Sequence, residues 1–381
     1  MFVNHGSAFG GVEKHMLDLI TRLEPAKFEP IVLCFGRYAY EDTLAADRGR
    51  NVKIISGLNR TRFQDYWRTF RELRPDVIVF ESGDVADFPW YAFPAAWFSG
   101  AGRVIDYQHD LATRVPRAPV NSARGVVRRL AGWRTRHDLE RRLTWRFSDT
   151  VVCVSNAIRS SLAREYGRNV GRRSLTIWNG VDVKHFSPPR ERPVIQRTRL
   201  GIGPGEKVVL SLARLDPTKR INLLIDAVAQ LRAEGVRLKC WIVGRGPEEE
   251  NLRRRVEEKG LTEDVLFLGF VDDIRPYHHE ADVFVLCKEG EGFGIALIEA
   301  MASGLPCIAP NNGGPAEIIS HGMDGWLIDP GSSSALARML RYVLEHESKR
   351  REASARARQK AVESFSIEAC TDKIKRLLDA S

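Results

Sequence analysis

The sequence predicts an α/β protein made of two doubly wound domains that face each other across a cleft. Apolar, strand-like runs alternate with helical patterns, and this alternation stops once near the middle of the chain and then resumes. Strands that alternate with helices form largely parallel sheets, because the helices return the chain across the sheet. At 381 residues the chain is long enough for two domains that each bury a core.

The N-terminal half opens with a short apolar piece, a glycine loop that includes Gly10 and Gly11, and then a helical pattern. A strand, a glycine loop and a helix form an arrangement that lets backbone approach a phosphate. Further strand-like runs follow at 28–36, 51–57, 75–82, 102–110 and 148–156. Ligands of such sheets bind beyond the carboxyl ends of the strands, so we expect site residues among those that end the runs. These are Glu81, His109, Asp110, Ser155 and Asn156.

The periodic pattern breaks between a turn signal at Asn179-Gly180 and a stiff Pro188-Pro189 pair. We therefore place an N-terminal domain at 1–188, a C-terminal domain at 189–364, and a C-terminal helix at 365–381 that docks back on the first domain. The second domain has strand-like runs at 208–213, 238–244, 265–270, 281–289, 306–310 and 325–329, with helices around 221–234, 248–259, 294–303 and 335–345.

The composition is that of a water-soluble globular protein. No apolar run reaches the roughly 18 to 20 residues of a membrane-spanning helix, so we expect a cytoplasmic location. The cysteines have no CxxC spacing, and most lie in or beside strand-like runs. They are therefore predicted to be reduced core residues and not disulfides or zinc ligands.

Positive charge is concentrated in the first half of the chain. Residues 1–190 hold 30 Lys and Arg against 20 Asp and Glu, whereas the rest holds 28 against 29. The stretch Arg114–Arg146 alone carries ten arginines and two acids. Such a face suits an anionic membrane surface or an acidic acceptor, and its simplest alternative is a solvated helix face. No nucleic-acid motif accompanies the charge, so we do not expect nucleic acid as a partner.

The stretch 289–317 contains two acids around a glycine-rich turn and an apolar helix. Glu291 precedes the turn, and Glu299 lies inside the helix, where a carboxylate needs a hydrogen-bonded or charged partner. A helix that begins after Gly294 presents unpaired N–H groups and a partial positive charge, which suits a phosphate. The alternative is a capped core helix with two surface glutamates.

Three other pieces end strands of the second domain and converge on the same sheet edge. Arg214 and Lys219 follow the first strand, and two cations at this position suit a diphosphate. The alternative is that both residues lie on a solvent-exposed turn. Gly244 ends the second strand, and Phe270-Val271 follow the third, where backbone groups meet a base edge. No DxD element or cluster of aspartates is present to hold Mg²⁺, so these pieces describe a nucleotide diphosphate site without a metal.

These motifs resemble those of the family 4 retaining glycosyltransferases, which have the GT-B fold of two Rossmann-like domains. The resemblance runs from Gly10-Gly11 nearly to the C-terminus and is strongest in EGFGIALIEAMASGLPCIAPNNGGPAEII, NGVDVKHFSP, ARLDPTKR and VGRGP. The departures are an abbreviated first strand and Ala213, where many members carry glycine.

The resemblance implies a role for each candidate residue. Glu299 would hold the ribose hydroxyls, Glu291 the donor sugar, and Arg214 and Lys219 the diphosphate. The backbone at Phe293, Gly294 and Ile295 would help hold phosphate and sugar, His109 would contact the donor sugar, and Gly10 and Gly11 would approach the diphosphate and the acceptor. No cofactor is implied beyond a nucleotide-sugar co-substrate, whose base we expect to be that of UDP or GDP.

The resemblance therefore implies a metal-independent retaining hexosyltransferase. Its partners would be a nucleotide-sugar donor and a glycan or lipid-linked acceptor, with polysaccharide biosynthesis at the inner face of the membrane as the expected setting. Two alternatives stay open: a two-domain sugar or nucleotide-binding protein without turnover, and a sugar-nucleotide epimerase of similar shape.

Overall fold

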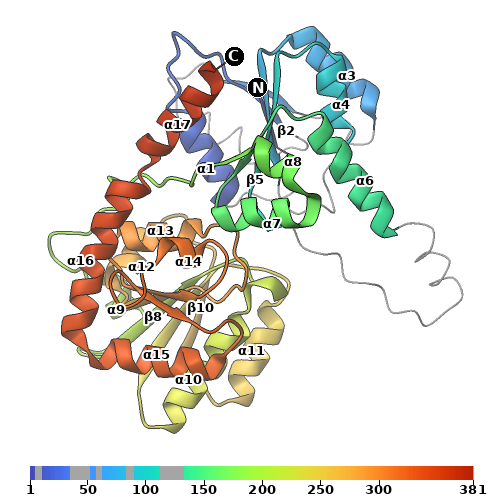
Figure 1. The fold of residues 1–381 in the computed structure, drawn as a ribbon. Helices are drawn as coiled ribbons and strands as arrows, with labels where there is room; N and C mark the ends of the chain where they lie inside the picture. Colours follow the sequence, from blue (N-terminus) through green and yellow to red (C-terminus); the bar gives the residue numbers. More distant parts are fainter. Residues whose placement is uncertain (5–10, 35–51, 57–61, 83–89, 112–132, 381) are drawn as a thin grey trace, which may run out of the picture. The chain divides into compact units, whose positions relative to one another are not determined.

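The computed structural model describes residues 1–4, 11–34, 52–56, 62–82, 90–111 and 133–380. Within them the chain forms two compact units (Figure 1). Unit 1 comprises Met1–Trp178 and Cys370–Ser381, and unit 2 comprises Asn179–Ala369. The chain thus leaves unit 1 earlier than the predicted boundary after Pro188, and the segment that begins at Asn179-Gly180 belongs to unit 2.

Unit 1 contains a seven-stranded parallel sheet in the order β3-β2-β1-β4-β5-β6-β7. Its strands are β1 (Phe2–Asn4), β2 (Ile31–Cys34), β3 (Lys53–Ser56), β4 (Val77–Ser82), β5 (Arg103–Gln108), β6 (Thr150–Cys153) and β7 (Ser174–Thr176). Its described helices are α1 (Gly11–Ile20), α3 (Phe63–Leu73), α4 (Ala92–Phe98), α6 (Trp133–Arg146), α7 (Asn156–Tyr166), α8 (Arg168–Arg173) and most of α17 (Ile367–Asp379). The short edge strand β7 was not predicted, because its three residues carry no periodic apolar pattern.

Aromatic side chains form much of the core of unit 1. Tyr66 and Phe70 lie one turn apart on α3 and are buried, since positions i and i+4 share one face of a helix. Phe70 meets Phe80 of β4 edge-on, and Phe80 lies 4.1 Å from the ring of Phe93 on α4. Helix α4 is therefore core over Ala92–Ala96, and its last two residues, Trp97 and Phe98, are exposed.

The C-terminal helix α17 packs within unit 1. Lys375 Nζ lies 3.0 Å from Glu24 Oε1, and the Arg103 guanidinium donates to the Leu377 carbonyl over 2.8 Å. Ile374, which directly precedes Lys375 on α17, is buried. The basic run that precedes α17 lies in a second long helix, α16 (Glu347–Ser364), which the sequence analysis did not predict.

Unit 2 contains a six-stranded parallel sheet in the order β10-β9-β8-β11-β12-β13. Its strands are β8 (Lys207–Leu212), β9 (Leu238–Val243), β10 (Val265–Gly269), β11 (Val283–Val285), β12 (Cys307–Pro310) and β13 (Trp326–Ile328). Besides α16, its described helices are α9 (Ile195–Arg199), α10 (Ile221–Ala233), α11 (Glu249–Glu258), α12 (Arg275–Glu280), α13 (Ile295–Ala302), α14 (Pro315–Ile318) and α15 (Ser333–Glu345), together with the 3-10 helix η2 (Pro217–Lys219).

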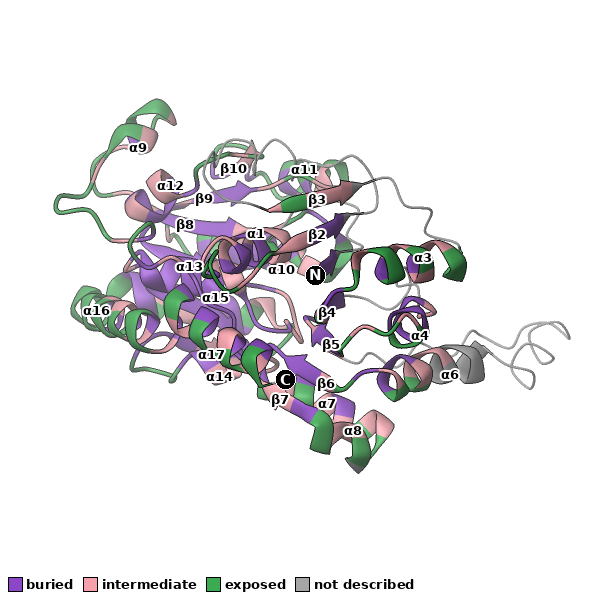
Figure 2. Cartoon of the chain, turned by 90° about the horizontal axis from the view of Figure 1, so that it is seen from above, coloured by how far each residue is buried: buried purple, intermediate pink, exposed green. Residues whose placement is uncertain are grey.

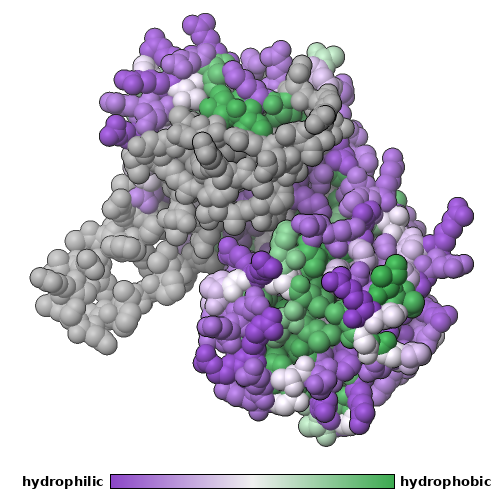
Figure 3. All heavy atoms as spheres, turned by 180° about the vertical axis from the view of Figure 1, so that it is seen from behind, coloured by the Kyte–Doolittle hydropathy of each residue, from purple (hydrophilic) through white to green (hydrophobic). Residues whose placement is uncertain are grey.

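The inner strands of unit 2 are mostly buried and the edge strand β10 is mostly half-buried, whereas α16 presents many exposed residues (Figure 2). Val208, Val209 and Leu210 of the central strand β8 are all inaccessible to solvent, as expected for a parallel strand covered on both faces. One face of unit 2, in the lower part of Figure 3, shows apolar side chains bordered by hydrophilic ones. Single exposed apolar side chains are common on folded proteins, and Phe270 is one of them in this unit.

None of the helices in the described part of the chain combines the length and the apolar character of a membrane-spanning segment. Cys153, Cys240, Cys287, Cys307 and Cys370 are free thiols in buried positions, which agrees with the predicted reduced core cysteines.

Candidate functional site

The order of strands in unit 2 reverses between β8 and β11, which pair side by side. From β8 the chain proceeds outward through β9 to β10, and then returns to β11 on the other side of β8. The loops that leave two such strands diverge, and the crevice between them is where open parallel sheets bind ligands. Lys219 follows β8 and Glu291 follows β11, so the two predicted residues lie on opposite sides of this switch point.

The loop after β8 is held by Asp216, which caps η2. Its carboxylate accepts hydrogen bonds from Thr218 N over 2.9 Å and from Arg214 Nε over 2.8 Å. Burial alone would raise the pKa of Asp216, but the hydrogen bond from the Thr218 hydroxyl, together with these two bonds, holds the pKa below its ordinary value. The Arg214 side chain is 66% exposed, so one guanidinium edge is fixed by Asp216 while much of the group faces solvent. The loop therefore presents a cation in a set orientation.

Glu291 lies between two lysines. Lys219 Nζ is 3.0 Å from Glu291 Oε2, and Lys288 Nζ is 3.5 Å from Glu291 Oε1. Burial alone would raise the pKa of Glu291, but the two ammonium groups lower it below its ordinary value. An ionised carboxylate accepts hydrogen bonds through both oxygens and donates none. The structure thus brings together Lys219 and Glu291, and it provides an acceptor of the kind that sugar hydroxyls require.

Two glycines shape the backbone around Glu291. Gly314 N donates to the Glu291 carbonyl over 2.8 Å. A Cβ atom on Gly313 would lie 2.4 Å from that same carbonyl oxygen, and one on Gly314 would lie 2.4 Å from Phe293 Cα. No side chain fits these positions without moving backbone. The GGPAE part of the motif therefore supports the loop that carries Glu291.

Helix α13 begins at Ile295 directly after Gly294, which has a φ of 107°. No side chain caps its first turn, so the first N–H groups lie at an uncapped helix end of the kind that binds phosphate oxygens. Glu299 lies on the same helix and is buried, at 7% exposure. The structure therefore places the predicted phosphate-binding backbone and the predicted ribose-binding acid on one short helix.

The loops after β8, β9 and β10 contact one another through glycine. Gly244 N donates to the Gly269 carbonyl over 2.8 Å, and a Cβ on Gly244 would lie 1.9 Å from the Ala213 carbonyl oxygen. Phe270 follows at 64% exposure, and Val271 is half-buried. Gly244 is thus a packing residue that fixes the segment before Arg214, while Phe270 offers an exposed ring at the same sheet edge.

In unit 1 the predicted site residue His109 directly follows β5. His109 Nε2 lies 2.5 Å from Glu81 Oε2, and both side chains are almost fully buried. Gly11 is the exposed first residue of α1, and Gly10 lies outside the described residues. Much of the basic stretch, 114–132, also lies outside them, whereas Arg142 and Arg146 of α6 are exposed.

Sequence reasoning missed three partners of the site. Lys288 pairs with Glu291, Arg220 Nη2 donates to Glu289 Oε1 over 2.9 Å, and Asn312 Oδ1 accepts from Gly290 N over 2.9 Å. Lys288 could have been predicted as a site residue, because it follows an apolar strand and directly precedes the glutamate motif. Asn312 did not, because its role depends on a loop contact between segments far apart in the sequence.

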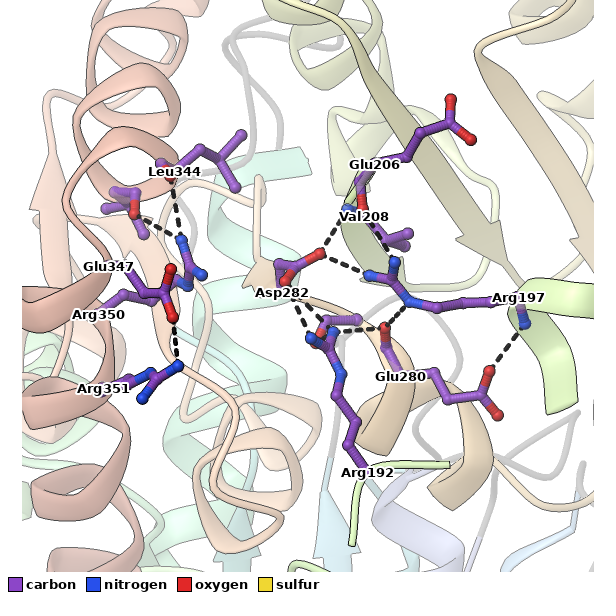
Figure 4. Close-up of polar contacts among 12 residues, drawn as sticks. Arg192, Arg197, Glu206, Val208, Glu280, Asp282, Leu344, Glu347, Arg350 and Arg351 are labelled. Atoms are coloured by element: carbon purple, nitrogen blue, oxygen red, sulfur yellow. Dashed lines mark hydrogen bonds and ion pairs between the residues drawn. The ribbon is translucent and has the colours of Figure 1, made fainter. Parts of the chain in front are cut away.

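A second polar cluster in unit 2 surrounds a cavity of about 330 Å³ beside the C-terminal end of α13 (Figure 4). Its charges are matched: Arg192 and Arg197 bind Asp282, and Arg351 binds Glu347. The Arg350 guanidinium donates to the carbonyls of Val343 and Leu344 at the end of α15. These contacts cap helices and join segments of unit 2, so we interpret this cluster as structural.

Two protein-family models match the chain in succession. The model described as Glycosyltransferase Family 4 matches residues 9–185, and the model described as Glycosyl transferases group 1 matches residues 195–360. The two matches together run through most of both units, and the second includes Arg214, Lys219, Glu291 and Glu299.

Two similar proteins are a synthase and a transferase. N-acetyl-alpha-D-glucosaminyl L-malate synthase of Bacillus anthracis is 31% identical over 222 residues, which are 58% of this chain and 57% of that protein. The GDP-mannose-dependent alpha-(1-6)-phosphatidylinositol monomannoside mannosyltransferase of Mycobacterium tuberculosis is 33% identical over 255 residues, which are 64% of this chain and 61% of that protein. The aligned part therefore spans less than two thirds of either relative.

The crystal structure of HepE from Anabaena in complex with UDP-glucose has the same fold. Its TM-score is 0.80 at 23% sequence identity, and the alignment covers 100% of this chain and 99% of that chain. The fold and the family matches agree: two units with parallel sheets, each matched by one of the two family models. The chain belongs to the family 4 glycosyltransferases and has their GT-B fold.

Proposed function

We propose that this protein is a retaining glycosyltransferase that moves a sugar from a nucleotide diphosphate donor to a hydroxyl group of a glycan, lipid-linked or small acceptor. The observation that carries the proposal is the contact of Lys219 with Glu291 at the switch point of unit 2, beside the uncapped start of α13. A cation and an ionised acid at one ligand crevice suit a donor that combines a diphosphate with sugar hydroxyls.

The names of similar proteins support this class of reaction. One similar protein is a GDP-mannose-dependent mannosyltransferase, and HepE was crystallised with UDP-glucose. We infer a hexosyl donor carried on UDP or GDP for this chain, with Glu299 on the ribose and Phe270-Val271 near the base. The backbone at Phe293, Gly294 and Ile295 would hold phosphate and sugar.

In the proposed reaction the bond between the anomeric carbon and the diphosphate oxygen breaks, and the acceptor oxygen forms a new bond on the same face of the sugar. The acceptor proton passes to the departing diphosphate oxygen. Negative charge grows on the diphosphate in an oxocarbenium-like transition state. Lys219, Arg214 and the start of α13 would stabilise that charge without a metal ion, so we expect activity to persist in EDTA.

A donor panel tests the proposal. The purified protein is incubated with UDP-, GDP- and ADP-sugars, and binding, slow hydrolysis and release of free nucleotide diphosphate are measured. Release from one donor class supports a transferase. Binding without release would instead support a sugar or nucleotide-binding protein, and a single product of unchanged mass would support an epimerase. The configuration of the released sugar, followed by NMR, tests retention.

We further propose that the basic stretch Arg114–Arg146 meets an anionic membrane surface, which would place a lipid-linked acceptor within reach. The exposed arginines of α6 support this, since each basic residue near an anionic surface contributes roughly 1 kcal/mol. Changing Arg128, Arg129, Arg141 and Arg142 to Ser should abolish sedimentation with vesicles that contain anionic lipid. Unchanged sedimentation would refute the membrane partner and would leave the transferase proposal intact.

A further inference from the structure

Two neighbouring strands of unit 1 bring Glu81 and His109 together at the carboxyl edge of the sheet. β4 and β5 pair in parallel, with Ser82 opposite Gln108, and His109 N donates to the Ser82 carbonyl over 3.0 Å. This register places the His109 ring beside the Glu81 side chain. The ring nitrogen Nε2 lies 2.5 Å from Glu81 Oε2, and the two side chains are 4% and 3% exposed.

Two described side chains contact the His109 ring. The ring of Tyr107 stacks on it at 4.9 Å with an angle of 20° between the planes. The other buried acid of this edge, Asp106, is occupied elsewhere: it accepts from Ser82 Oγ over 2.6 Å and from Gln108 Nε2 over 2.7 Å. Among the described acids, Glu81 is therefore the one that fixes the ring.

The two ring nitrogens of His109 differ in their surroundings. Nε2 faces Glu81, whereas Nδ1 is buried and has no hydrogen-bond partner among the described residues. Buried polar groups without a partner are rare in folded proteins, and they point to a missing ligand, ion or water. Donor and acceptor of this contact depend on the tautomer of His109; with Glu81 as the acceptor, Nε2 carries the proton and Nδ1 is the unprotonated nitrogen.

We propose that Glu81 is a positioning residue for the transfer reaction. By accepting from Nε2–H, it fixes both the orientation and the tautomer of His109, so that Nδ1 is the atom that meets a hydroxyl group of the donor sugar. This inference rests on the proposed function and on the resemblance, which implies that His109 contacts the donor sugar. It adds the partner that orients the histidine and names the nitrogen that faces the substrate.

The tautomer can be measured without turnover. The protein is labelled with ¹⁵N-histidine, and the His109 ring signals are identified by their absence in His109→Gln. We expect Nε2 to appear as the proton-bearing nitrogen in the wild type and to lose that character in Glu81→Leu. A wild-type His109 with the proton on Nδ1 and a bare Nε2 would overturn the proposal, whether or not any donor is turned over.

Kinetics test the consequence for the reaction. Glu81→Leu keeps the size of the side chain but removes the acceptor, and misplacing a substrate-positioning group commonly costs about 10²-fold in rate. We expect kcat to fall by about that factor, while KM for the donor changes less than about threefold, because unit 2 holds the diphosphate. Glu81→Gln keeps an acceptor oxygen and should retain kcat to within about tenfold.

Ser82→Ala is the matched control, because it removes a buried hydrogen bond one residue away but leaves the contact of Glu81 with His109. We expect its kcat to stay near the wild-type value even if its melting temperature falls. The proposal is overturned if Glu81→Leu keeps a near-normal kcat while His109→Gln loses activity, or if Glu81→Gln is as impaired as Glu81→Leu. If no donor is turned over by the wild type, the proposed function fails and the NMR result still decides the role of Glu81.

Discussion

The two units present their sheet edges with different chemistry. In unit 2, the edge at the switch point gathers cations and an acid: Lys219 and Lys288 lie beside Glu291, and Arg214 is bonded to Asp216 in the loop after β8. In unit 1, the edge carries a buried hydrogen-bonded pair, Glu81 with His109. Fixed positive charge suits a diphosphate, whereas a histidine with one nitrogen that has no partner among the described residues suits a neutral hydroxyl. The comparison teaches that the same parallel-sheet architecture can prepare one edge for a charged group and another for an uncharged one.

The net charge of each half of the chain differs from the charge at its sheet edge. The N-terminal half holds the excess of basic residues, while the half that carries the candidate diphosphate site is close to neutral. Lys219 and Lys288 are offset by Glu291, and Arg220 is offset by Glu289. The proposed recognition of the donor would therefore depend on a few placed charges, and the excess positive charge belongs to the part of the chain that we propose meets a membrane.

The largest effect should come from the lysine at the switch point. Lys219→Ala should lower turnover by roughly 10² to 10³ or more, because it removes a donor that stabilises the leaving diphosphate. Lys259→Ala is the matched control: that lysine lies 3.2 Å from Asp226 and is about as exposed, but it is outside the site. Steady-state kinetics with the preferred donor measures both, and near-normal turnover in Lys219→Ala would disprove its role.

The acid beside this lysine should matter to a similar degree. Glu291→Ala should lower turnover by roughly 10² to 10³ while the fold is kept, since the sugar hydroxyls lose an ionised acceptor. Glu289→Ala provides the control, because Glu289 lies two residues earlier and pairs with Arg220 at the same loop. Comparable losses in the two variants would show that loop integrity, and not the Glu291 carboxylate, is what the reaction needs.

A smaller effect is expected from the glycine that joins the loops after β8 and β9. Gly244→Ala should cost at least about 2 kcal/mol in the free energy of unfolding beyond Gly235→Ala. Both glycines have a positive φ, but a Cβ at Gly235 meets nothing within 4 Å, whereas one at Gly244 meets the Ala213 carbonyl oxygen. Urea unfolding measures the difference, and equal losses would mean that the contact with Ala213 relaxes freely.

The smallest effect is a change of stability with pH. The folded-state pKa of Glu291 lies below its ordinary value of about 4.3, because Lys219 and Lys288 outweigh its burial. A depressed pKa stabilises the fold above the unfolded-state pKa, and this stabilisation is lost as the pH falls through the folded value. The wild type should therefore lose more unfolding free energy than Glu291→Gln between pH 6 and 3. A difference that stays constant over this range would contradict the ion pairs.

Much of the donor half of the site could be predicted from the sequence. Arg214, Lys219, Glu291 and Glu299 were found because polar residues at the ends of apolar strands, and an acid inside an apolar helix, are local patterns. The structure places all of them in unit 2, with Lys219 and Glu291 in direct contact. The edge strand β7 and the helix α16 were missed, because a three-residue strand and a highly charged helix show no apolar periodicity.

The sequence by itself determined the fold class, the family and the residue types of the candidate donor site, because these follow from the order of apolar runs and from short motifs. Only the tertiary structure decided which residues meet. Glu81 and His109 are far apart in the chain and become neighbours through the register of β4 with β5. Lys219 and Glu291 meet because β8 and β11, which are not consecutive in the chain, pair side by side in the sheet. Register and strand order arise from packing between distant segments, and no local pattern encodes them.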